Sequence, residues 1–303
     1  MDPLEKLDLP WDTSLCLLRE LANRGHETYL LTPNVLFSTG NSVKGNGSRV
    51  HPLGHHRYQL SPSKNFNLAH FDAVWIRKDP PFDSGYLALT YLLEPVARKT
   101  YVINHPRGIR NANEKLFVFQ FPSYAPASIV SAHPDKILEF QKKLGTDLVI
   151  KPLYEKGGKG VFLLKQKRRG NHALLEKATR GGKEVVVAQK FVPVSRGRGD
   201  KRILLWRGEI LGAFERIPKA GEFRSNLSLG GRFVRTPVTE REKRIVRELR
   251  PVLLKEGLLF VGIDTRGGKL IEVNVTSPAG LVELDRLYGG RATKKMADEI
   301  EKI

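Results

Sequence analysis

Two carboxylates and one amide toward the end of the chain form a candidate metal site. In a strand over 269–275, Glu272 and Asn274 point to the same face, because side chains alternate along a strand. Asp264 lies on the strand before, and it faces Glu272 if the turn between the two strands has an odd number of residues. Oxygen ligands of this kind suit octahedral Mg²⁺ shared with phosphate. The alternative is an exposed polar face of a hairpin, which a two-residue turn would favour.

A glycine-rich turn between two predicted strands is a candidate phosphate loop. The backbone amides of Gly157 and Gly158 could approach an oxyanion closely, because glycine has no side chain. Lys151 ends the preceding strand and Lys115 lies on a predicted helix, so two ammonium groups could share one polyphosphate. The spacing differs from that of a P-loop nucleoside triphosphatase, whose glycine loop opens a helix. An ordinary tight turn is the alternative for the glycines alone.

Three arginines lie in or beside a polar, glycine-containing segment over 218–235. Arg202, Arg216 and Arg224 each carry a guanidinium group, which can bind a carboxylate or a phosphate at two points. A segment of this length in a compact enzyme is often a lid, and a plain surface hairpin is the alternative. The single cysteine, Cys16, lies on an apolar helical stripe, so the sequence indicates no cysteine nucleophile.

The composition is that of a folded, strongly basic protein. The chain has 303 residues, 40% of them hydrophobic, which predicts two or three packed units. Its 51 basic and 32 acidic residues give a net charge of +19, which attracts polyanions. Residues 142–202 contain 17 Lys or Arg and 5 Asp or Glu, so +12 of the charge lies there. The apolar stretches are too short to span a bilayer and one cysteine cannot form an internal disulfide, so we expect a soluble, cytoplasmic protein without a membrane partner.

Alternating helical and strand patterns predict an α/β fold of several units. The first unit should contain a parallel sheet and a loop or irregular hairpin over 38–63, with a helix from Asp12 to Gly25, strands at 28–31, 73–76 and 101–103, and a helix over 86–99. A smaller unit should contain strands at 128–130, 148–151, 161–164 and 185–189 and a helix over 134–144. The last unit should contain two strands joined at 207–209, a helix over 240–256 and paired strands at 258–265 and 269–275.

With these residues assembled, the chain closely resembles the bacterial glutathione synthetases, a family of the ATP-grasp superfamily. The resemblance spans nearly the whole chain. The matching runs are Met1-Asp2-Pro3, Arg77-Lys78-Asp79-Pro80-Pro81-Phe82-Asp83, Asn113-Glu114-Lys115-Leu116-Phe117, Lys151-Pro152-Leu153, Asp200-Lys201-Arg202, Val261-Gly262-Ile263-Asp264 and Glu272-Val273-Asn274-Val275-Thr276-Ser277-Pro278.

The resemblance implies a mixed α/β ATP-grasp fold with three domains. These are an N-terminal Rossmann-like substrate domain over 1–110, a small lid domain over 111–190 and a C-terminal catalytic domain over 191–303. The family usually opens with a hydrophobic strand before Met-Asp-Pro, whereas this chain starts at that motif. We therefore expect either that the N-terminal sheet lacks its first strand or that the true start of the protein lies before Met1.

The resemblance also implies a role for each matching residue. Residues expected to bind ATP are Lys115 and Lys151 at the phosphates, Gly157 and Gly158 in the loop, Gln189, Lys190, Phe191 and Val192 at the adenine hinge, and Asp200 at the ribose. Mg²⁺ or Mn²⁺ is expected on Asp264, Glu272 and Asn274, with Arg202 and Arg216 as catalytic residues. Substrate binding is expected of Arg77, Arg224, Asn226, Gly230, Gly231, Thr276 and Ser277.

The implied activity is the ATP-dependent joining of γ-glutamylcysteine to glycine through an acyl phosphate, which gives glutathione, ADP and phosphate. A homo-oligomer is expected, because members of the family are commonly oligomers. Two departures from the family are the charged Lys190-Phe191 pair in the hinge and the run Ala279-Gly280-Leu281-Val282. The alternatives are another ATP-grasp carboxylate–amine ligase and a basic nucleic-acid-binding protein on this fold; nucleic acid is disfavoured because no aromatic and basic platform accompanies the charge.

Overall fold

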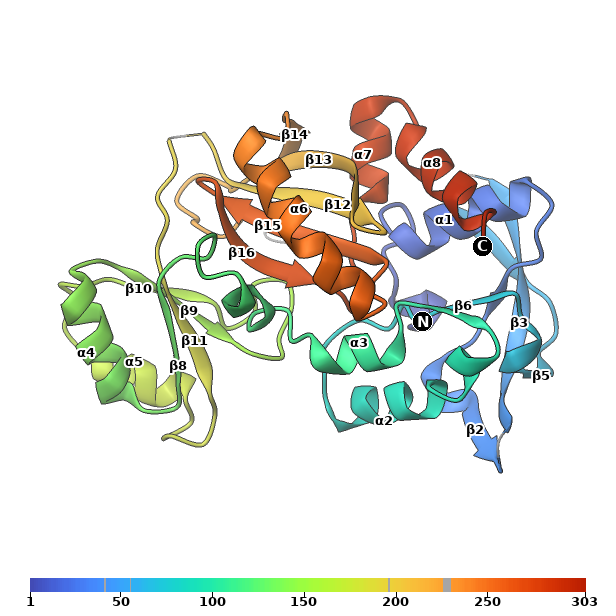
Figure 1. Cartoon of the computed structure of the whole chain (residues 1–303), viewed down its shortest axis with the longest axis horizontal. Coiled ribbons are helices and arrows are strands. Elements are labelled where there is room, and N and C mark those ends of the chain that lie inside the picture. Colours follow the sequence, from blue (N-terminus) through green and yellow to red (C-terminus); the bar gives the residue numbers. More distant parts are fainter. Residues whose placement is uncertain (41, 55, 196, 226–229) are drawn as a thin grey trace.

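The computed structural model describes residues 1–40, 42–54, 56–195, 197–225 and 230–303. It places them in a five-stranded N-terminal sheet, a two-stranded pair, a four-stranded sheet from the middle of the chain and a five-stranded C-terminal sheet (Figure 1). The four-stranded sheet lies at one end of the molecule, the N-terminal elements lie at the other, and the C-terminal sheet lies between them. None of the helices within these ranges is long and apolar enough to cross a membrane.

The N-terminal sheet is built around one long strand, β3 (Ser42–Gly54). The other strands all pair with β3 in antiparallel fashion, and they are β1 (Tyr29–Leu30), β2 (Leu36–Thr39), β4 (Arg57–Leu60) and β5 (Lys64–Asn67). The prediction of a loop over 38–63 is therefore wrong, and the alternative of an irregular hairpin is closer. Gly45 and Gly47 led to the prediction of a loop, because glycine is typical of loops. In the structure they occupy buried strand positions against leucine side chains, and a Cβ on Gly45 would lie 2.6 Å from Leu36.

The parallel sheet predicted for this region is confined to one pair of strands. β6 (Ala73–Trp75) and β7 (Tyr101–Ile103) run in parallel, and α2 (Ser84–Leu93) lies between them in the chain. β1 does not extend this pair, because it joins β3 instead. The remaining N-terminal helices are α1 (Thr13–Asn23), which begins where the Asp12 side chain accepts the Leu15 N–H at 2.8 Å, and α3 (Pro106–Asn111).

The four-stranded sheet has a core of its own. Its strands are ordered β10-β9-β11-β8 and every neighbouring pair is antiparallel, with β8 (Ser128–Ser131), β9 (Leu148–Pro152), β10 (Phe162–Leu164) and β11 (Val186–Lys190). Two helices, α4 (Pro134–Leu144) and α5 (Asn171–Ala178), cover it (Figure 1). Ile137 and Leu175 from these helices pack against Ile150 and Leu164 from the strands. The sequence predicted these strands and α4, but not α5.

The C-terminal sheet is antiparallel throughout, in the order β14-β13-β12-β15-β16. Its strands are β12 (Asp200–Trp206), β13 (Glu209–Ile217), β14 (Arg232–Arg235), β15 (Phe260–Arg266) and β16 (Lys269–Asn274). Helix α6 (Glu240–Lys255) is closed at its start by a capping box between Thr239 and Glu242. Helices α7 (Leu281–Tyr288) and α8 (Arg291–Ile300) complete the chain, and α8 lies beside α1 (Figure 1).

Both faces of this sheet are covered along much of their length. Ile203 and Leu205 of β12 pack in the same cluster as Leu249 of α6, whereas Leu204 and Trp206 share a cluster with α7 and α8. Side chains alternate along a strand, so Asp200 and Arg202 continue the face that Leu204 presents to α7. The polar end of that face lies toward the four-stranded sheet and holds the candidate site.

Candidate active site

A cavity of about 150 Å³ lies where the four-stranded sheet meets the C-terminal sheet. Its lining includes most of the residues that the sequence singled out: Lys115, Lys151, Gly157, Gly158, Gln189, Lys190, Phe191, Val192, Asp200, Arg202, Arg216, Arg224, Asp264, Glu272 and Asn274. The fold thus brings residues that are more than a hundred positions apart in the sequence to the walls of one cavity. The cavity is both charged and partly apolar, because Val149, Val161 and Ile271 also line it.

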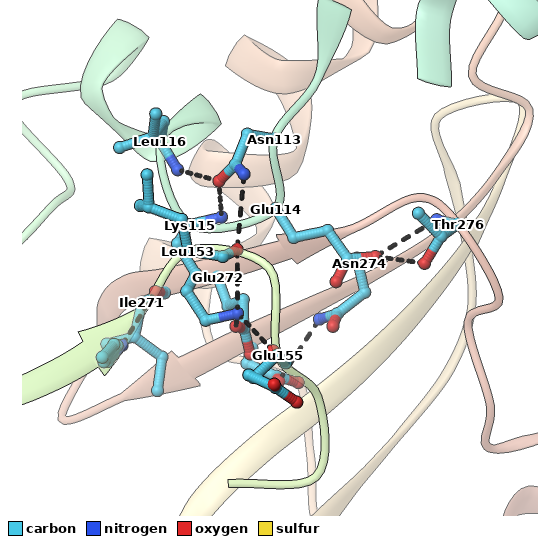
Figure 2. A network of polar contacts seen from close by, with 12 residues as sticks. Asn113, Glu114, Lys115, Leu116, Leu153, Glu155, Ile271, Glu272, Asn274 and Thr276 are labelled. Carbon is cyan, nitrogen blue, oxygen red and sulfur yellow. Dashed lines mark hydrogen bonds and ion pairs between the residues drawn. The ribbon is translucent and has the colours of Figure 1, made fainter. Parts of the chain in front are cut away.

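The two lysines reach the cavity from different elements. Lys151, on β9, donates from Nζ to Gln189 Oε1 at 2.9 Å and to the carbonyl of Ile271 at 3.3 Å. Burial lowers the pKa of Lys151, although the charge of Glu272 opposes the shift. Lys115 donates from Nζ to the carbonyl of Glu155 at 2.7 Å, and its Nζ lies 3.5 Å from Glu272 Oε1 (Figure 2). Both ammonium groups are therefore held at defined places on the cavity wall.

Lys115 does not lie on a helix, as the sequence predicted. It lies in a turn before a short 3₁₀ helix over Phe117–Gln120. The side-chain oxygen of Asn113 accepts the N–H groups of Lys115 at 3.0 Å and of Leu116 at 3.1 Å (Figure 2). An asparagine that binds nearby backbone groups in this way competes with helix formation, which explains the turn.

The β15–β16 hairpin brings Asp264 opposite Glu272 by a route that the sequence did not predict. The turn has two residues, Gly267 and Gly268, because Arg266 pairs with Lys269. A regular hairpin with this turn would place Asp264 opposite Ile271, so that the Asp264 and Glu272 side chains would point to opposite faces of the sheet. The structure instead has a bulge: Thr265 pairs with Leu270, and Asp264 pairs with Glu272. One extra residue on β16, Ile271, thus places Asp264 opposite Glu272 even though the turn has only two residues.

Asp264 is the centre of a buried ion-pair network. Arg202 donates from Nε to Asp264 Oδ1 at 2.5 Å and from Nη2 to Oδ2 at 2.9 Å, a two-point contact. Arg216 joins two carboxylates, since its Nη2 lies 2.9 Å from Asp264 Oδ2 and its Nε lies 2.7 Å from Asp200 Oδ1. Burial opposes ionisation of Asp264, but the two guanidinium groups outweigh it and hold the pKa of this carboxyl well below its usual range.

The oxygen atoms near Asp264 fit a hard divalent cation. Among the described residues, no three His, Cys, Asp or Glu side chains gather into a metal site, so an amide oxygen would have to complete one. Asn274 supplies it: its Nδ2 donates to the carbonyl of Gly262 at 3.1 Å and faces Asp264 Oδ2 at 3.4 Å, which leaves Oδ1 as an acceptor. The carboxylate of Glu272 and the remaining lone pair of Asp264 Oδ1, which accepts only from Arg202 Nε among the described residues, complete a set of oxygen ligands that Mg²⁺ prefers.

The glycine loop between β9 and β10 forms an exposed rim of the cavity. Gly157 and Gly158 have φ angles of 63° and 76°, which residues with a Cβ rarely adopt. Arg224 donates from Nη1 to the carbonyl of Gly158 at 3.1 Å and also pairs with Glu222 at 2.7 Å, so the arginine segment reaches the loop. The bonds from Arg224 lower the pKa of Glu222 to about 2.

Several residues expected to bind substrate lie outside the cavity lining. Arg77 is buried and donates to Ser14 Oγ at 2.8 Å and to the carbonyl of Pro278 at 2.9 Å. Thr276 is buried beside Glu114, Ser277 follows it in a bend, and Gly230 and Gly231 precede β14. Asn226 lies outside the described residues. The structure therefore joins Arg77 to the segment after β16 rather than to the cavity itself.

Two residues that sequence reasoning missed also line the cavity. Arg266 donates from Nε to the carbonyl of Val192 at 2.8 Å and lies over the ring of Phe191, which ties β15 to the predicted hinge. Glu114 is half-buried, and desolvation followed by the charge of Glu272 raises its pKa. The one sequence signal for Glu114 is its place between Asn113 and Lys115, whereas Arg266 had none.

Comparisons with known proteins give a consistent result. The family model described as prokaryotic glutathione synthetase, N-terminal domain, matches residues 1–110, and the model for the ATP-grasp domain of the same family matches residues 114–289. The glutathione synthetase of Nitrosomonas europaea is 40% identical over 309 residues, covering 100% of this chain and 96% of the relative. That of Synechocystis is 40% identical over 320 residues, covering 100% and 98%.

Solved structures at low identity share the fold. The ATP-grasp ligase PsnB, complexed with a phosphomimetic variant of its minimal precursor, Mg and ADP, is 17% identical with a TM-score of 0.64, covering 96% of this chain and 95% of that one. The D-cycloserine synthetase DcsG is 18% identical with a TM-score of 0.57, covering 77% and 86%. The predicted ATP-grasp fold is thereby confirmed.

Proposed function

The chain belongs to the prokaryotic glutathione synthetase family, and we propose that ATP, γ-glutamylcysteine and glycine react in the cavity between its four-stranded and C-terminal sheets. Its relatives are ATP-dependent ligases, and so is this chain. The observation that carries the proposal is the convergence of Lys115, Lys151 and the Asp264 network on one cavity from separate elements. Cations, oxygen ligands and an apolar wall are what a magnesium nucleotide requires.

ATP is assigned to the part of the cavity that the four-stranded sheet forms. Lys115 and Lys151 would hold the phosphates, with help from the amides of Gly157 and Gly158. Val149, Val161 and Ile271 offer an apolar surface for adenine beside the hinge residues Gln189, Lys190, Phe191 and Val192. Asp200, which also lines the cavity, would bind the ribose.

Magnesium, or manganese, is assigned to Asp264, Glu272 and Asn274. When bound, it would neutralise charge on the phosphates and orient the transferring group. The Mg and ADP of the PsnB complex agree with this use of a divalent cation by an ATP-grasp ligase. Arg224, which lines the cavity, and Thr276 and Ser277, which follow β16 just outside its lining, are proposed to contact the peptide substrate, and Arg77 holds the Pro278 segment.

The chain's own residues account for the electrostatics of the reaction. A carboxylate oxygen of γ-glutamylcysteine attacks the γ-phosphorus, ADP leaves, and an acyl phosphate forms. Arg202 and Arg216, already fixed by Asp264 and Asp200, have further N–H groups to stabilise the transferring phosphoryl group. The glycine amine then attacks the acyl carbon, phosphate leaves with the carboxylate oxygen, and the amine loses a proton. No side-chain nucleophile is required.

A substrate-omission assay tests this function. Purified protein with ATP and Mg²⁺ should release phosphate only when γ-glutamylcysteine and glycine are both present, and the product should be glutathione. Phosphate release with a different carboxylate, together with none from γ-glutamylcysteine, would replace this function with that of another carboxylate–amine ligase. Asp264→Asn is the matched control, because it should bring release down to the background.

We also propose a cytoplasmic homo-oligomer. The single cysteine, Cys16, is a buried free thiol, which is typical of a reducing compartment. Light scattering on the purified chain would give the oligomeric state, and a monomeric mass would reject the second part of this proposal.

A further inference from the structure

Glu114 binds the outer edge of β16, the strand that carries Glu272 and Asn274. Its backbone carbonyl accepts the Val273 N–H at 2.9 Å, and its carboxyl oxygen Oε1 accepts the Val275 N–H at 3.1 Å. Alternate N–H groups of a strand point to the same edge, and the opposite edge of β16 is paired with β15. Glu114 therefore fixes the backbone on each side of Asn274.

The same carboxyl oxygen also holds the residue that follows. Glu114 Oε1 accepts the Thr276 N–H at 3.2 Å and the Thr276 hydroxyl at 2.7 Å (Figure 2). Three donors from two successive residues thus converge on one oxygen. Because β16 ends at Asn274, these bonds replace the ladder that a further strand would supply at this point.

Glu114 is itself held from both sides. Asn113 caps the turn through its side-chain oxygen and donates from Nδ2 to the carbonyl of Leu153 at 3.3 Å. Lys115 binds the carbonyl of Glu155 and lies beside Glu272 (Figure 2). The three residues 113–115 thereby connect the start of the glycine loop to the strand of the candidate metal site.

We propose that Glu114 is a positioning residue, which holds Asn274 and the end of β16 so that the oxygen ligands of the divalent cation stand in binding geometry. This inference rests on the proposed metal site. A shift of β16 would move Asn274 away from Asp264, to which its amide now reaches across the hairpin. Groups that orient metal ligands without touching the metal commonly matter for affinity in this way.

The test is a manganese titration of Glu114→Ala and Glu114→Gln, saturated with a non-hydrolysable ATP analogue. Free Mn²⁺ is followed by electron paramagnetic resonance, so the readout does not need turnover. Glu114→Ala should weaken Mn²⁺ binding by about 10–100-fold, the usual effect of losing a group that orients a ligand. Glu114→Gln should bind Mn²⁺ nearly as the original chain does, because an amide oxygen can accept the same N–H groups.

Two outcomes would overturn the proposal. Unchanged Mn²⁺ binding in Glu114→Ala would show that β16 keeps its place without this residue. Equal losses in Glu114→Ala and Glu114→Gln would show that the negative charge acts, rather than the hydrogen bonds. If Glu114→Ala fails to fold, Thr276→Val tests the proposal instead, because it removes one of the three donors to Glu114 Oε1. Mn²⁺ binding that is not weakened at all in Thr276→Val would overturn the proposal.

Glu242→Gln is the matched control. Like Glu114, Glu242 is a carboxylate with several hydrogen-bond partners, including Lys201 Nζ at 2.7 Å and the Thr265 hydroxyl at 2.8 Å, but it is buried away from the cavity. It should lower the melting temperature and leave Mn²⁺ binding unchanged. The titration uses neither γ-glutamylcysteine nor glycine, so a chain that makes no glutathione yet shows the expected Mn²⁺ losses would reject the proposed reaction and keep this inference.

Discussion

The two walls of the cavity differ in how firmly they hold their charges. On the C-terminal sheet, the side chains of Asp264 and Arg202 are 3% and 10% exposed and are joined by a two-point contact. On the glycine loop, the side chains of Lys156 and Lys159 are 50% and 77% exposed. The charges that we propose to stabilise the transferring phosphoryl group are therefore fixed in the protein interior, whereas the charges at the rim stay in water.

Asp264→Asn should produce the largest effect, because it removes a charge from the fixed wall. It takes away a proposed metal ligand and the partner of Arg202 and Arg216. We expect kcat to fall by about 10²–10³-fold, as for the loss of one group that stabilises charge in a transition state. Steady-state kinetics at saturating ATP and Mg²⁺ would measure it. An unchanged kcat would remove Asp264 from the site.

The same substitution should change stability in a pH-dependent way. The pKa of Asp264 lies below its usual value in the folded chain, so its ionised form stabilises the fold. We expect Asp264→Asn to cost about 1–3 kcal/mol at neutral pH, as for a buried donor that loses its partner. The difference between the two chains should persist above the ordinary Asp pKa of about 3.9 and shrink as the pH falls below it. Urea unfolding at several pH values would measure this, and a difference that grows on acidification would contradict it.

Lys151→Ala should weaken ATP binding by a smaller factor. Lys151 is half-buried on β9 and donates a hydrogen bond to Gln189 of the predicted hinge. Losing one charge-assisted hydrogen bond costs about 1.5 kcal/mol, so the KM for ATP should rise about tenfold. Initial rates over a range of ATP concentrations would show it. A lower kcat with the same KM would instead place Lys151 in the chemical step.

Lys156→Ala should have the smallest effect. Lys156 forms an exposed ion pair with Asp79, which joins the glycine loop to the N-terminal part of the chain. Exposed pairs are worth about 0–1 kcal/mol, so melting temperature and KM for ATP should change little. Any change should also decrease with added salt. A loss of activity or stability as large as that expected for Asp264→Asn would mean that Lys156, at the rim, also has a defined role in the site.

Local signals predicted much of the two ATP-grasp sheets. The helix over 134–144 was predicted with the bounds that α4 has, because Pro134 suits the first turn of a helix and Gly145, with a φ of 63°, suits its end. The predicted strands β8, β9 and β11 differ from the observed ones by a residue or two at their ends. These elements carry their boundaries in their own residues.

What the sequence did not predict depends on contacts between distant segments. The bulge at Ile271 has no local signal, yet it decides whether Asp264 faces Glu272. The hydrogen bonds from Val275 and Thr276 to Glu114 join positions about 160 residues apart, and no spacing rule predicts them. Likewise, Gly45 and Gly47 read as loop residues until Leu36 and Leu31 are seen to pack on them. The site roles remain predictions that the variants above test.

The most direct measurement is an isotope transfer from substrate to phosphate. γ-Glutamylcysteine labelled with ¹⁸O at both oxygens of its cysteinyl carboxylate would be incubated with ATP, Mg²⁺ and glycine, and the released phosphate examined by mass spectrometry. If the carboxylate attacks the γ-phosphorus and glycine then displaces phosphate, each phosphate should carry one ¹⁸O atom. Glutathione formed together with unlabelled phosphate would contradict an acyl phosphate and the role given to this cavity.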